Sequence, residues 1–424
     1  MLQINFIREN KELVIKGLKT KRFTNPEEAI EAIIALDATR RQVQTDRDQA
    51  LSDSKKVSKE IGALMKQGKK EEAEVIKKQS AELRDNSKEL DEQVKDLENQ
   101  LTQMLYQIPN IPHESVPEGN GADDNVVVLE KGELPKLEGE ALPHWELTKK
   151  YDIIDFELGN KVTGAGFPFY KGKGAKLQRA LIQFFLDEAE AAGYLEVQVP
   201  LLINEESGYA TGQLPDKEGQ MYHVQNENFF LIPTAEVPLT NMFRGAIISH
   251  EQLPKKVTAH TPCFRREAGS WGAHVRGLNR LHQFDKVEIV QVQHPDNSYA
   301  ELENMCAHVE GLLEKLELPY RKLLLCGGDI SFNAALCFDM ETYSAAQERW
   351  LEVSSVSNFE TFQANRMLLR YRDKDGKTKL AHTLNGSALA LPRIVATILE
   401  NNQTPEGIKI PKVLQPYCKF DMID

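Results

Sequence analysis

The chain has 424 residues, 41% of them hydrophobic and 27% charged, and its formal net charge at pH 7 is −12. A general polyanion binder is usually basic, so this balance excludes one and requires any nucleic-acid contact to be local. No stretch approaches about 18 uninterrupted apolar residues, and the five cysteines form no CxxC pair. We therefore expect a cytoplasmic protein with reduced thiols, no membrane segment and no structural zinc.

Residues 1–108 are expected to form an N-terminal domain dominated by a long helical hairpin over residues 27–107. Apolar side chains recur there every seven residues, which is typical of helices that supercoil against a partner. The repeating positions are Ala29, Leu36, Val43, Ala50, Val57, Leu64, Ile76, Leu83, Leu90 and Leu97, with Val94 and Leu101 in a second row. A polar break at residues 67–70 predicts the tip of an antiparallel pair, each helix being about 60 Å long. Because Arg40, Arg47 and Ser54 weaken the seam, we expect an arm that projects into solvent.

Residues 109–150 hold five prolines, which predicts a connector, and residues 151–424 are expected to form a catalytic domain. A helical pattern over 180–192 is followed by strand-like runs at 229–232, 246–249, 286–292 and 349–353. This pattern predicts an α+β fold in which helices flank an antiparallel β-sheet. No Walker loop or GxGxxG loop opens a βαβ unit, so a bound ATP would have to be held by side chains, arginines above all.

The segment 261–288 carries the densest group of candidate site residues, and we expect two extended stretches joined by a glycine-rich loop. Strand alternation predicts that Arg265 and Glu267 share one face of the first stretch. It likewise predicts that Phe284, Lys286 and Glu288 share one face of the second. Together these side chains could bind a phosphate, an adenine and an amine. Taken alone, Arg265 and Glu267 are also compatible with an ordinary charged sheet surface.

This segment resembles motif 2 of the class II aminoacyl-tRNA synthetases, in the form typical of the seryl-specific branch, FRxEAG…RGLxRxHQFxKxE. Residues 385–393 read NGSALALPR and resemble motif 3, and residues 181–200 resemble motif 1, which forms the dimer interface in this class. The TAE triplet at 234–236 is similar to the branch's serine-binding loop, and EVSS at 352–355 to its ATP-phosphate segment. The resemblance covers essentially the whole chain, with departures at Arg266, Trp271 and Pro392.

The resemblance implies a role for each matching residue. ATP would contact Arg265, Arg266, Glu267, Arg276, Phe284, Glu352, Val353, Ser354, Ser355 and Arg393. Serine would contact Thr234, Ala235, Glu236, Arg265, Glu288, Asn385 and Ser387. The catalytic residues would be Arg265, Glu288 and Arg393. Glu352 and Ser355 would hold Mg²⁺, a hard cation that prefers oxygen ligands.

The implied reaction has two steps. ATP activates L-serine to seryl-adenylate with release of pyrophosphate, and serine then passes to the 3′-terminal ribose of tRNA(Ser), or of tRNA(Sec) where present. The enzyme would act as a homodimer that receives the tRNA acceptor end at the catalytic domain and the long variable arm at the helical hairpin. The lysines for this second contact are Lys55, Lys56, Lys59, Lys66, Lys69, Lys70, Lys77 and Lys78. Recognition there would be mainly of shape and backbone.

Three alternatives stay open: a non-catalytic relative that has kept the fold, a ligase that loads serine onto a carrier protein, and a structural coiled-coil protein. A non-catalytic relative should have lost motif residues, yet Arg265, Glu288 and Arg393 are all present. A carrier-protein ligase should lack the long arm, and a coiled-coil protein does not account for residues 151–424. For the tip lysines alone, the competing interpretation is an ordinary solvated helical surface.

Overall fold

The computed structural model describes residues 1–137, 139, 141–268 and 276–424, so Trp271 lies outside the described residues. The chain divides into two compact units. The first consists of Met1–Lys19 with Phe23–Pro109, and the second of Thr20–Arg22 with Asn110–Asp424. The division falls at Pro109, where the proline-rich segment begins.

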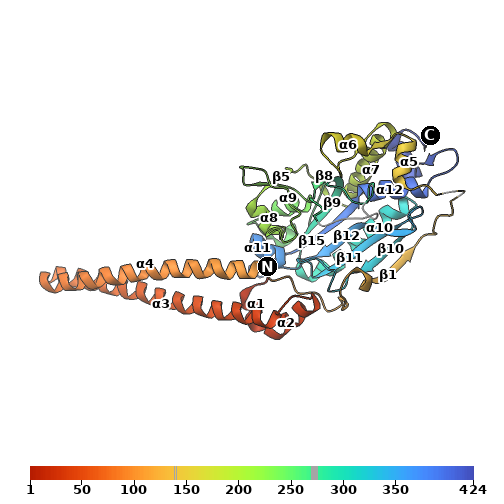
Figure 1. Cartoon of the computed structure of the whole chain (residues 1–424). Helices are drawn as coiled ribbons and strands as arrows, with labels where there is room; N and C mark the ends of the chain where they lie inside the picture. Colours follow the sequence, from red (N-terminus) through yellow and green to blue (C-terminus); the bar gives the residue numbers. More distant parts are fainter. Residues whose placement is uncertain (138, 140, 269–275) are drawn as a thin grey trace. The chain divides into compact units, whose positions relative to one another are not determined.

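The first unit is built around two long antiparallel helices, α3 (Pro26–Lys66) and α4 (Lys70–Tyr106), which lie side by side in Figure 1. Pro26 occupies the first turn of α3, where its missing N–H would have no helical partner in any case. The turn between the helices contains Gly68, whose φ of +78° suits glycine. The predicted helical hairpin is therefore confirmed. Two short helices, α1 (Ile4–Glu9) and α2 (Lys11–Thr20), precede it.

The seam between α3 and α4 differs from the prediction in its side chains. The buried row of α4 consists of Ala73, Ser80, Ser87, Val94 and Leu101. The row that the heptads favour, from Ile76 to Leu97, is only half-buried. Small side chains fill the buried row because they let two helices approach closely, whereas a hydrophobicity pattern gives weight to the larger apolar residues.

A buried carboxylate near the start of α3 joins it to α1. Asp37 is fully buried and forms ion pairs with Arg8 at 2.9 Å, with Arg40 at 2.8 Å and with Arg41 at 3.1 Å. Burial acts to raise the pKa of Asp37, but hydrogen bonding to Arg40 and the charges of the three arginines lower it overall. Arg40 therefore interrupts the apolar seam because it is a partner of this carboxylate.

Within the residues that the structure describes, the second unit is built on an eight-stranded sheet, antiparallel except between its last two strands. The strands, in spatial order, are β1 (Val126–Lys131), β10 (Tyr320–Leu324), β11 (Leu336–Ser344), β12 (Arg349–Asn358), β15 (His382–Ala390), β9 (Gln283–Gln293), β8 (Lys255–Phe264) and β4 (Leu195–Glu196). The expected runs at 286–292 and 349–353 lie within β9 and β12. The segment expected to be a connector also supplies the edge strand β1.

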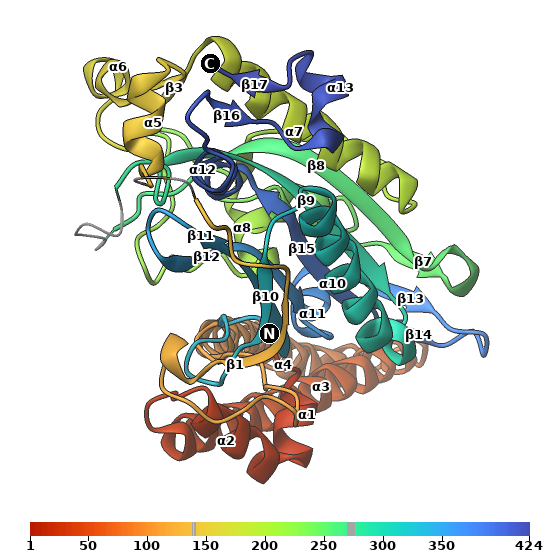
Figure 2. The same ribbon diagram turned by 90° about the vertical axis from the view of Figure 1, so that its right-hand side faces the viewer.

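Three helices cover one face of this sheet: α7 (Gly172–Ala191), α10 (Ser298–Lys315) and α12 (Leu391–Asn401) (Figure 2). Side chains alternate along β9, so Val287 and Ile289 pack into the core with these helices while Glu288 points to the other side. On that other side, the short helix α9 (Glu236–Asn241) packs against the sheet through Leu239 and Val290. The predicted α+β architecture is confirmed. Short segments cover the face of the sheet that carries Glu288.

The remaining elements form that shell and the rim of the unit. The small sheets are β14 (Thr378–Leu380) with β13 (Arg370–Arg372) and β7 (Ile247–Ser249), β2 (Ile154–Asp155) with β3 (Phe169–Tyr170), β5 (Leu202–Asn204) with β6 (Phe229–Leu231), and β16 (Ile408–Lys409) with β17 (Met422–Ile423). The short helices are η1 (Ala122–Asp124), α5 (His144–Lys150), α6 (Phe156–Val162), α8 (Glu205–Thr211), η2 (His250–Gln252), η4 (Pro295–Asn297), α11 (Phe362–Met367), η5 (Lys412–Leu414) and α13 (Gln415–Cys418). Among the described residues, no helix combines the length and apolar character that crossing a membrane requires.

Candidate functional site

The candidate site lies on the polar face of β9, between β8 and β15. In the ladder, Ala259 of β8 and Ser387 of β15 stand on either side of Glu288. The expected extended stretch through Glu267 is wrong, because β8 ends at Phe264 and Glu267 has a φ of +50°. Arg265 and Glu267 therefore lie in the loop that leaves the strand, where strand alternation no longer decides which way they face.

A buried polar group, the Glu288 cluster (Thr234, Glu236, Lys286, Glu288 and Asn385), occupies the middle of this face. The hydroxyl of Thr234 donates to Glu288 Oε2 at 3.2 Å, and it accepts hydrogen bonds from Lys286 Nζ at 2.9 Å and from the Glu236 amide at 3.1 Å. Lys286 also forms an ion pair with Glu288, and both side chains are almost completely buried. Because burying such groups unpaired is costly, the mutual hydrogen bonds fix their positions.

Asn385 and Gln363 complete the hydrogen bonding of the two carboxylates. Asn385 Nδ2 donates to Glu236 Oε2 at 2.9 Å and to Glu288 Oε1 at 3.1 Å, and Gln363 Nε2 donates to Glu236 Oε1 at 2.7 Å. Burial, followed by repulsion from the carboxylate of Glu288, raises the pKa of Glu236 to about 7. When both carboxylates are ionised they face the single ammonium of Lys286, which leaves one negative charge for a cationic ligand.

Arg265 and Phe284 stack on each other beside the cluster. The guanidinium of Arg265 lies 5.3 Å from the centroid of the Phe284 ring, and its Nε donates to the carbonyl of Pro233 at 3.2 Å. An Arg over an aromatic face is a stabilising cation–π arrangement that keeps the outward N–H groups available. Glu267 forms an ion pair with Arg280 across the motif 2 loop. A flat aromatic ring next to a guanidinium suits a purine linked to phosphate.

A β-bulge in β12 decides which side chains share its solvent-facing side. The register with β11 shifts so that Asp339 pairs with Ser355 but Glu341 pairs with Glu352, which leaves Val353 as the extra residue. Residues three apart in a regular strand face opposite sides, yet the bulge brings Glu352 and Ser355 to the same side. Val353 itself is buried in the core.

Asp339 joins these oxygen groups, although nothing in the sequence singled it out. Burial, together with the nearby carboxylate of Glu352, raises the pKa of Asp339 well above its usual range. Crowded carboxylates and a hydroxyl are the oxygen donors that a hard divalent cation prefers. The donor set around Glu352 and Ser355 therefore fits the Mg²⁺ that the motif resemblance implies.

Arg393 links β12 to the motif 2 loop. Its Nη1 donates to the carbonyl of Glu352 at 2.6 Å and lies 3.5 Å from the Glu352 carboxylate, while its Nε donates to the carbonyl of Asn279 at 3.1 Å. Pro392 precedes it within the first turn of α12, a position that proline tolerates. The departure at Pro392 therefore leaves Arg393 in place.

A second buried network, which the sequence did not suggest, fixes the backbone at Leu278, shortly before β9. The carboxylate of Glu400 accepts hydrogen bonds at 2.9 Å from the amide of His144 and at 3.0 Å from Gln347, and it also accepts the hydroxyl of Ser344. The His144 ring lies with Nδ1 2.7 Å from Glu400 and with Nε2 accepting the amide of Leu278 at 2.8 Å. The ring therefore has its proton on Nδ1 and connects α12 to the backbone at Leu278.

The other expected site residues differ in exposure. Ala235, Ser354 and Ser387 are buried, and the hydroxyl of Ser354 donates to the carbonyl of Ser387 at 2.6 Å. Arg266 is exposed, and the guanidinium of Arg276 lies 4.9 Å from the centroid of the Trp145 ring. Lys286, Gln363 and Asp339 were not among the expected site residues. Of these three, only Lys286 could have been identified from the sequence, because strand alternation places it on one face with Phe284 and Glu288.

Replacing Glu400 with alanine is expected to destabilise the second unit. The change removes the common acceptor of His144, Ser344 and Gln347, and each buried donor left unpaired costs about 1–3 kcal/mol. Tryptophan fluorescence during urea unfolding measures the effect, because all three tryptophans fall between residues 110 and 424 of the sequence. We expect a clearly lower unfolding midpoint.

The matched control is Glu406→Ala, which removes an exposed carboxylate six residues further along the chain. Such a surface change should alter stability by no more than about 0.5 kcal/mol. Equal midpoints for the two variants would show that the Glu400 network contributes nothing.

Comparison with known proteins identifies the family of the chain. Residues 1–112 match the family described as the seryl-tRNA synthetase N-terminal domain, and residues 221–402 match the tRNA synthetase class II core domain (G, H, P, S and T). The serine–tRNA ligase of Salinibacter ruber is 49% identical over 100% of this chain and 99% of its own length. A seryl-tRNA synthetase from Pyrococcus horikoshii, solved with ATP, superposes with a TM-score of 0.93 at 33% identity, covering 100% of this chain and 99% of the other. A cytoplasmic serine–tRNA ligase from Naegleria fowleri, solved with AMP, has a TM-score of 0.88 at 27% identity over the same shares of the two chains. The chain accordingly belongs to the seryl-tRNA synthetase family of class II aminoacyl-tRNA ligases.

Proposed function

We propose that the Glu288 cluster binds L-serine and that Arg265, Phe284 and Arg393 bind the ATP that activates it. The observation that carries this proposal is the pair of buried carboxylates around one lysine. Their residual negative charge suits the ammonium group of an amino acid, for which Glu236 and Thr234 are the partners. The carboxylate of serine then faces Arg265, whose guanidinium lies at the rim of the cluster on the Phe284 ring.

Selection of serine rests on its hydroxyl. Glu288 is fully buried and has Thr234, Lys286 and Asn385 as partners, so it is a fixed acceptor for a small hydroxyl group. When alanine binds in place of serine, that buried acceptor loses its ligand partner. A site built around a hydroxyl can reject the analogue that lacks it by orders of magnitude, because its polar groups stay unpaired.

In the activation step, the serine carboxylate attacks the α-phosphate of ATP and pyrophosphate leaves. The protein's part is to align the two reactants and to balance the charge that develops on the phosphate oxygens. Arg265 and Arg393 supply that balance. Glu352 and Ser355, with Asp339 beside them, hold Mg²⁺, which neutralises phosphate charge when bound.

The acceptor proposed for the second step is tRNA(Ser), with tRNA(Sec) as a further acceptor where it is present. The arm supports this proposal, because all eight lysines named at its tip are exposed. Three of them pair with acidic residues three positions away: Lys56 with Asp53, Lys69 with Glu72 and Lys77 with Glu74. Exposed pairs of this kind are worth little, so a polyphosphate backbone can replace the acidic partners. A cytoplasmic location follows from this substrate.

We also propose a homodimer formed through the edge of the sheet at β4. Leu195 of that strand is 64% exposed and Met242 nearby is 48% exposed. Both line a hollow together with Phe243 and Pro254. Exposed apolar side chains on an unpaired sheet edge are typical of a surface that a second subunit covers.

Serine-dependent ATP–pyrophosphate exchange tests the proposed activity, and Arg265→Ala tests the proposed site. Wild-type protein should exchange with serine and not with alanine. The variant should lose about 10²–10³-fold in rate, because the phosphate charge that develops loses its donor. Arg244→Ala, an exposed arginine that pairs with Glu206, is the matched control and should keep wild-type exchange.

If wild-type protein fails to exchange although it is folded, the chain is a non-catalytic relative. If Arg265→Ala exchanges at the rate of Arg244→Ala, the activity stands but the site is misplaced.

The role of the arm is tested by removing two tip charges, with Lys55→Ala and Lys59→Ala combined. This variant should exchange pyrophosphate normally but show a raised KM for tRNA(Ser). The slope of log affinity against log salt should become shallower by about 0.7–0.9 for each lost phosphate contact. The control combines Lys88→Ala and Lys95→Ala, lysines of α4 that lie further from the turn and pair with Asp85 and Asp91.

An unchanged KM and salt slope in the tip variant would mean that the tip lysines form an ordinary solvated surface. Serine transfer to a carrier protein instead of tRNA would favour the carrier-protein alternative.

A further inference from the structure

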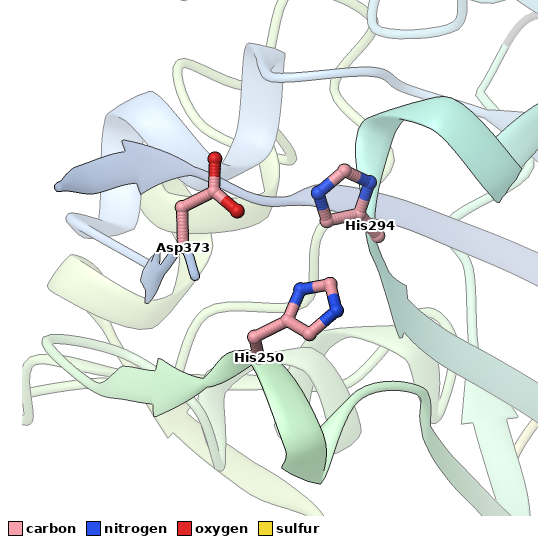
Figure 3. A group of neighbouring side chains, drawn as sticks. All are labelled: His250, His294 and Asp373. Carbon is pink, nitrogen blue, oxygen red and sulfur yellow. The ribbon is translucent and has the colours of Figure 1, made fainter. Parts of the chain in front are cut away.

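Three metal-ligating side chains converge away from the Glu288 cluster, at the ends of strands in the second unit. His250 begins η2 just after β7, His294 follows the end of β9, and Asp373 follows β13. One ligand atom from each lies within 4.8 Å of the others. Figure 3 shows the two imidazoles and the carboxylate turned toward a common space. His294 is six residues from Glu288 along the chain, which is about 20 Å in an extended strand.

His250 has a buried atom that lacks a partner. Its Nδ1 is inaccessible to solvent, and it has no hydrogen-bond partner within the described part of the chain. A buried polar atom without a partner costs about 1–3 kcal/mol, and such atoms are rare in native proteins. A metal ion in the space between the three side chains would supply the missing partner.

Asp296 lies beside Nδ1 of His294. The Nδ1 of His294 accepts the amide of Asp296 at 3.2 Å and lies 3.6 Å from the Asp296 carboxylate. Nε2 is therefore the atom that remains for the common space. Because Nδ1 accepts the Asp296 amide, the proton of the neutral ring lies on Nε2, and metal binding at Nε2 requires the other tautomer. In that tautomer Nδ1 gives up the amide and donates its N–H to the Asp296 carboxylate, as metal-binding histidines usually do.

Asp373 already has two partners but keeps room for a third. One carboxylate oxygen accepts the amide of Lys374 at 2.7 Å, and the other pairs with Lys379. Each carboxylate oxygen can accept two hydrogen bonds, so each retains a lone pair. Within the described contacts neither imidazole donates to Asp373, so the group is not simply a histidine–aspartate hydrogen bond.

We propose that His250, His294 and Asp373 bind a divalent transition-metal ion, with zinc as the best fit. Two imidazole nitrogens and one carboxylate oxygen are ligands that zinc accepts, and a water molecule would complete a tetrahedron. Tetrahedral ligands lie about 3.4 Å apart at zinc–nitrogen distances of about 2.0–2.1 Å. The three ligand atoms, which lie within 4.8 Å of one another, therefore have to come closer together when zinc binds.

The position of this site indicates what the metal does. β7 and β13 are neighbouring parallel strands of the three-stranded sheet, whereas β9 belongs to the eight-stranded sheet. A metal held by all three strand ends joins the small sheet to the large one. It stabilises the folded unit in proportion to RT ln(1 + [metal]/Kd) and takes no part in the adenylation chemistry. The expectation of no structural zinc rested on cysteine spacing, which does not detect ligands from three distant segments.

The test is a titration of chelator-treated full-length protein with zinc chloride. Calorimetry measures the affinity and stoichiometry of zinc binding, and thermal unfolding measures the change in the unfolding midpoint. Wild-type protein should bind one equivalent of zinc and unfold at a higher temperature when it is loaded. His250→Ala and Asp373→Asn should each weaken zinc binding by about 100-fold or more and abolish the thermal shift. Magnesium chloride is the hard-cation control, and any thermal shift that it produces should be the same in wild type, His250→Ala and Asp373→Asn.

Two further variants keep the test specific. His223→Ala removes an exposed histidine outside the group and should bind zinc like the wild type. Lys379→Met removes the ammonium that competes for Asp373 and should bind zinc more tightly. The proposal is overturned if wild-type protein binds no zinc, or if folded His250→Ala and Asp373→Asn bind it as the wild type does.

Discussion

Two buried carboxylates share one buried ammonium on the polar face of β9, and the rest of the catalytic unit follows from that constraint. Lys286 offsets part of the repulsion between Glu236 and Glu288, Asn385 donates to both carboxylates, and Thr234 connects Lys286 to Glu288. Burial, followed by repulsion from Glu288, raises the pKa of Glu236, so keeping both carboxylates ionised is unfavourable without a cationic partner. The residual negative charge of the pair becomes useful when an ammonium ligand arrives. In the proposed assignment, the ammonium group of serine satisfies this charge when it binds.

The surrounding structure keeps this cluster rigid. The helix layer packs only on the other face of the sheet, so the polar face can be closed by short segments that carry Thr234, Glu236 and Gln363. The bulge in β12 turns Glu352 and Ser355 to the same side, next to Arg393. Glu400 and His144 fix the backbone at Leu278, which lies shortly before β9. Glu400 and His144 lie far in sequence from Leu278, which they position, whereas the bulge acts on side chains of its own strand.

The sequence predicts the elements that have strong local patterns, but not the residues whose role depends on long-range contacts. Heptads predicted the hairpin, and motif similarity identified Thr234, Arg265 and Glu288 as site candidates. Val94 and Leu101 of the buried α4 row were predicted, whereas Ser80 and Ser87 of the same row were not, because close helix approach has no hydrophobic signature. Nor were Asp339 and Glu400, since a carboxylate becomes a site residue only through its neighbours in space. The strand assumed through Glu267 was wrong because the chain turns at a positive φ immediately after β8.

The most direct test of the central claim is the KM for serine in pyrophosphate exchange as a function of pH, compared between wild type and Glu236→Gln. Serine binds as an ammonium and favours ionised Glu236, whose pKa of about 7 means that the group is largely protonated at lower pH. The wild-type KM should therefore rise toward about tenfold per pH unit below pH 7 and level off above it, because binding must then displace a proton. Glu236→Gln should bind serine weakly at every pH and show no such rise. A flat wild-type profile, or an equal rise in the variant, would contradict the assignment of the buried carboxylate pair to serine.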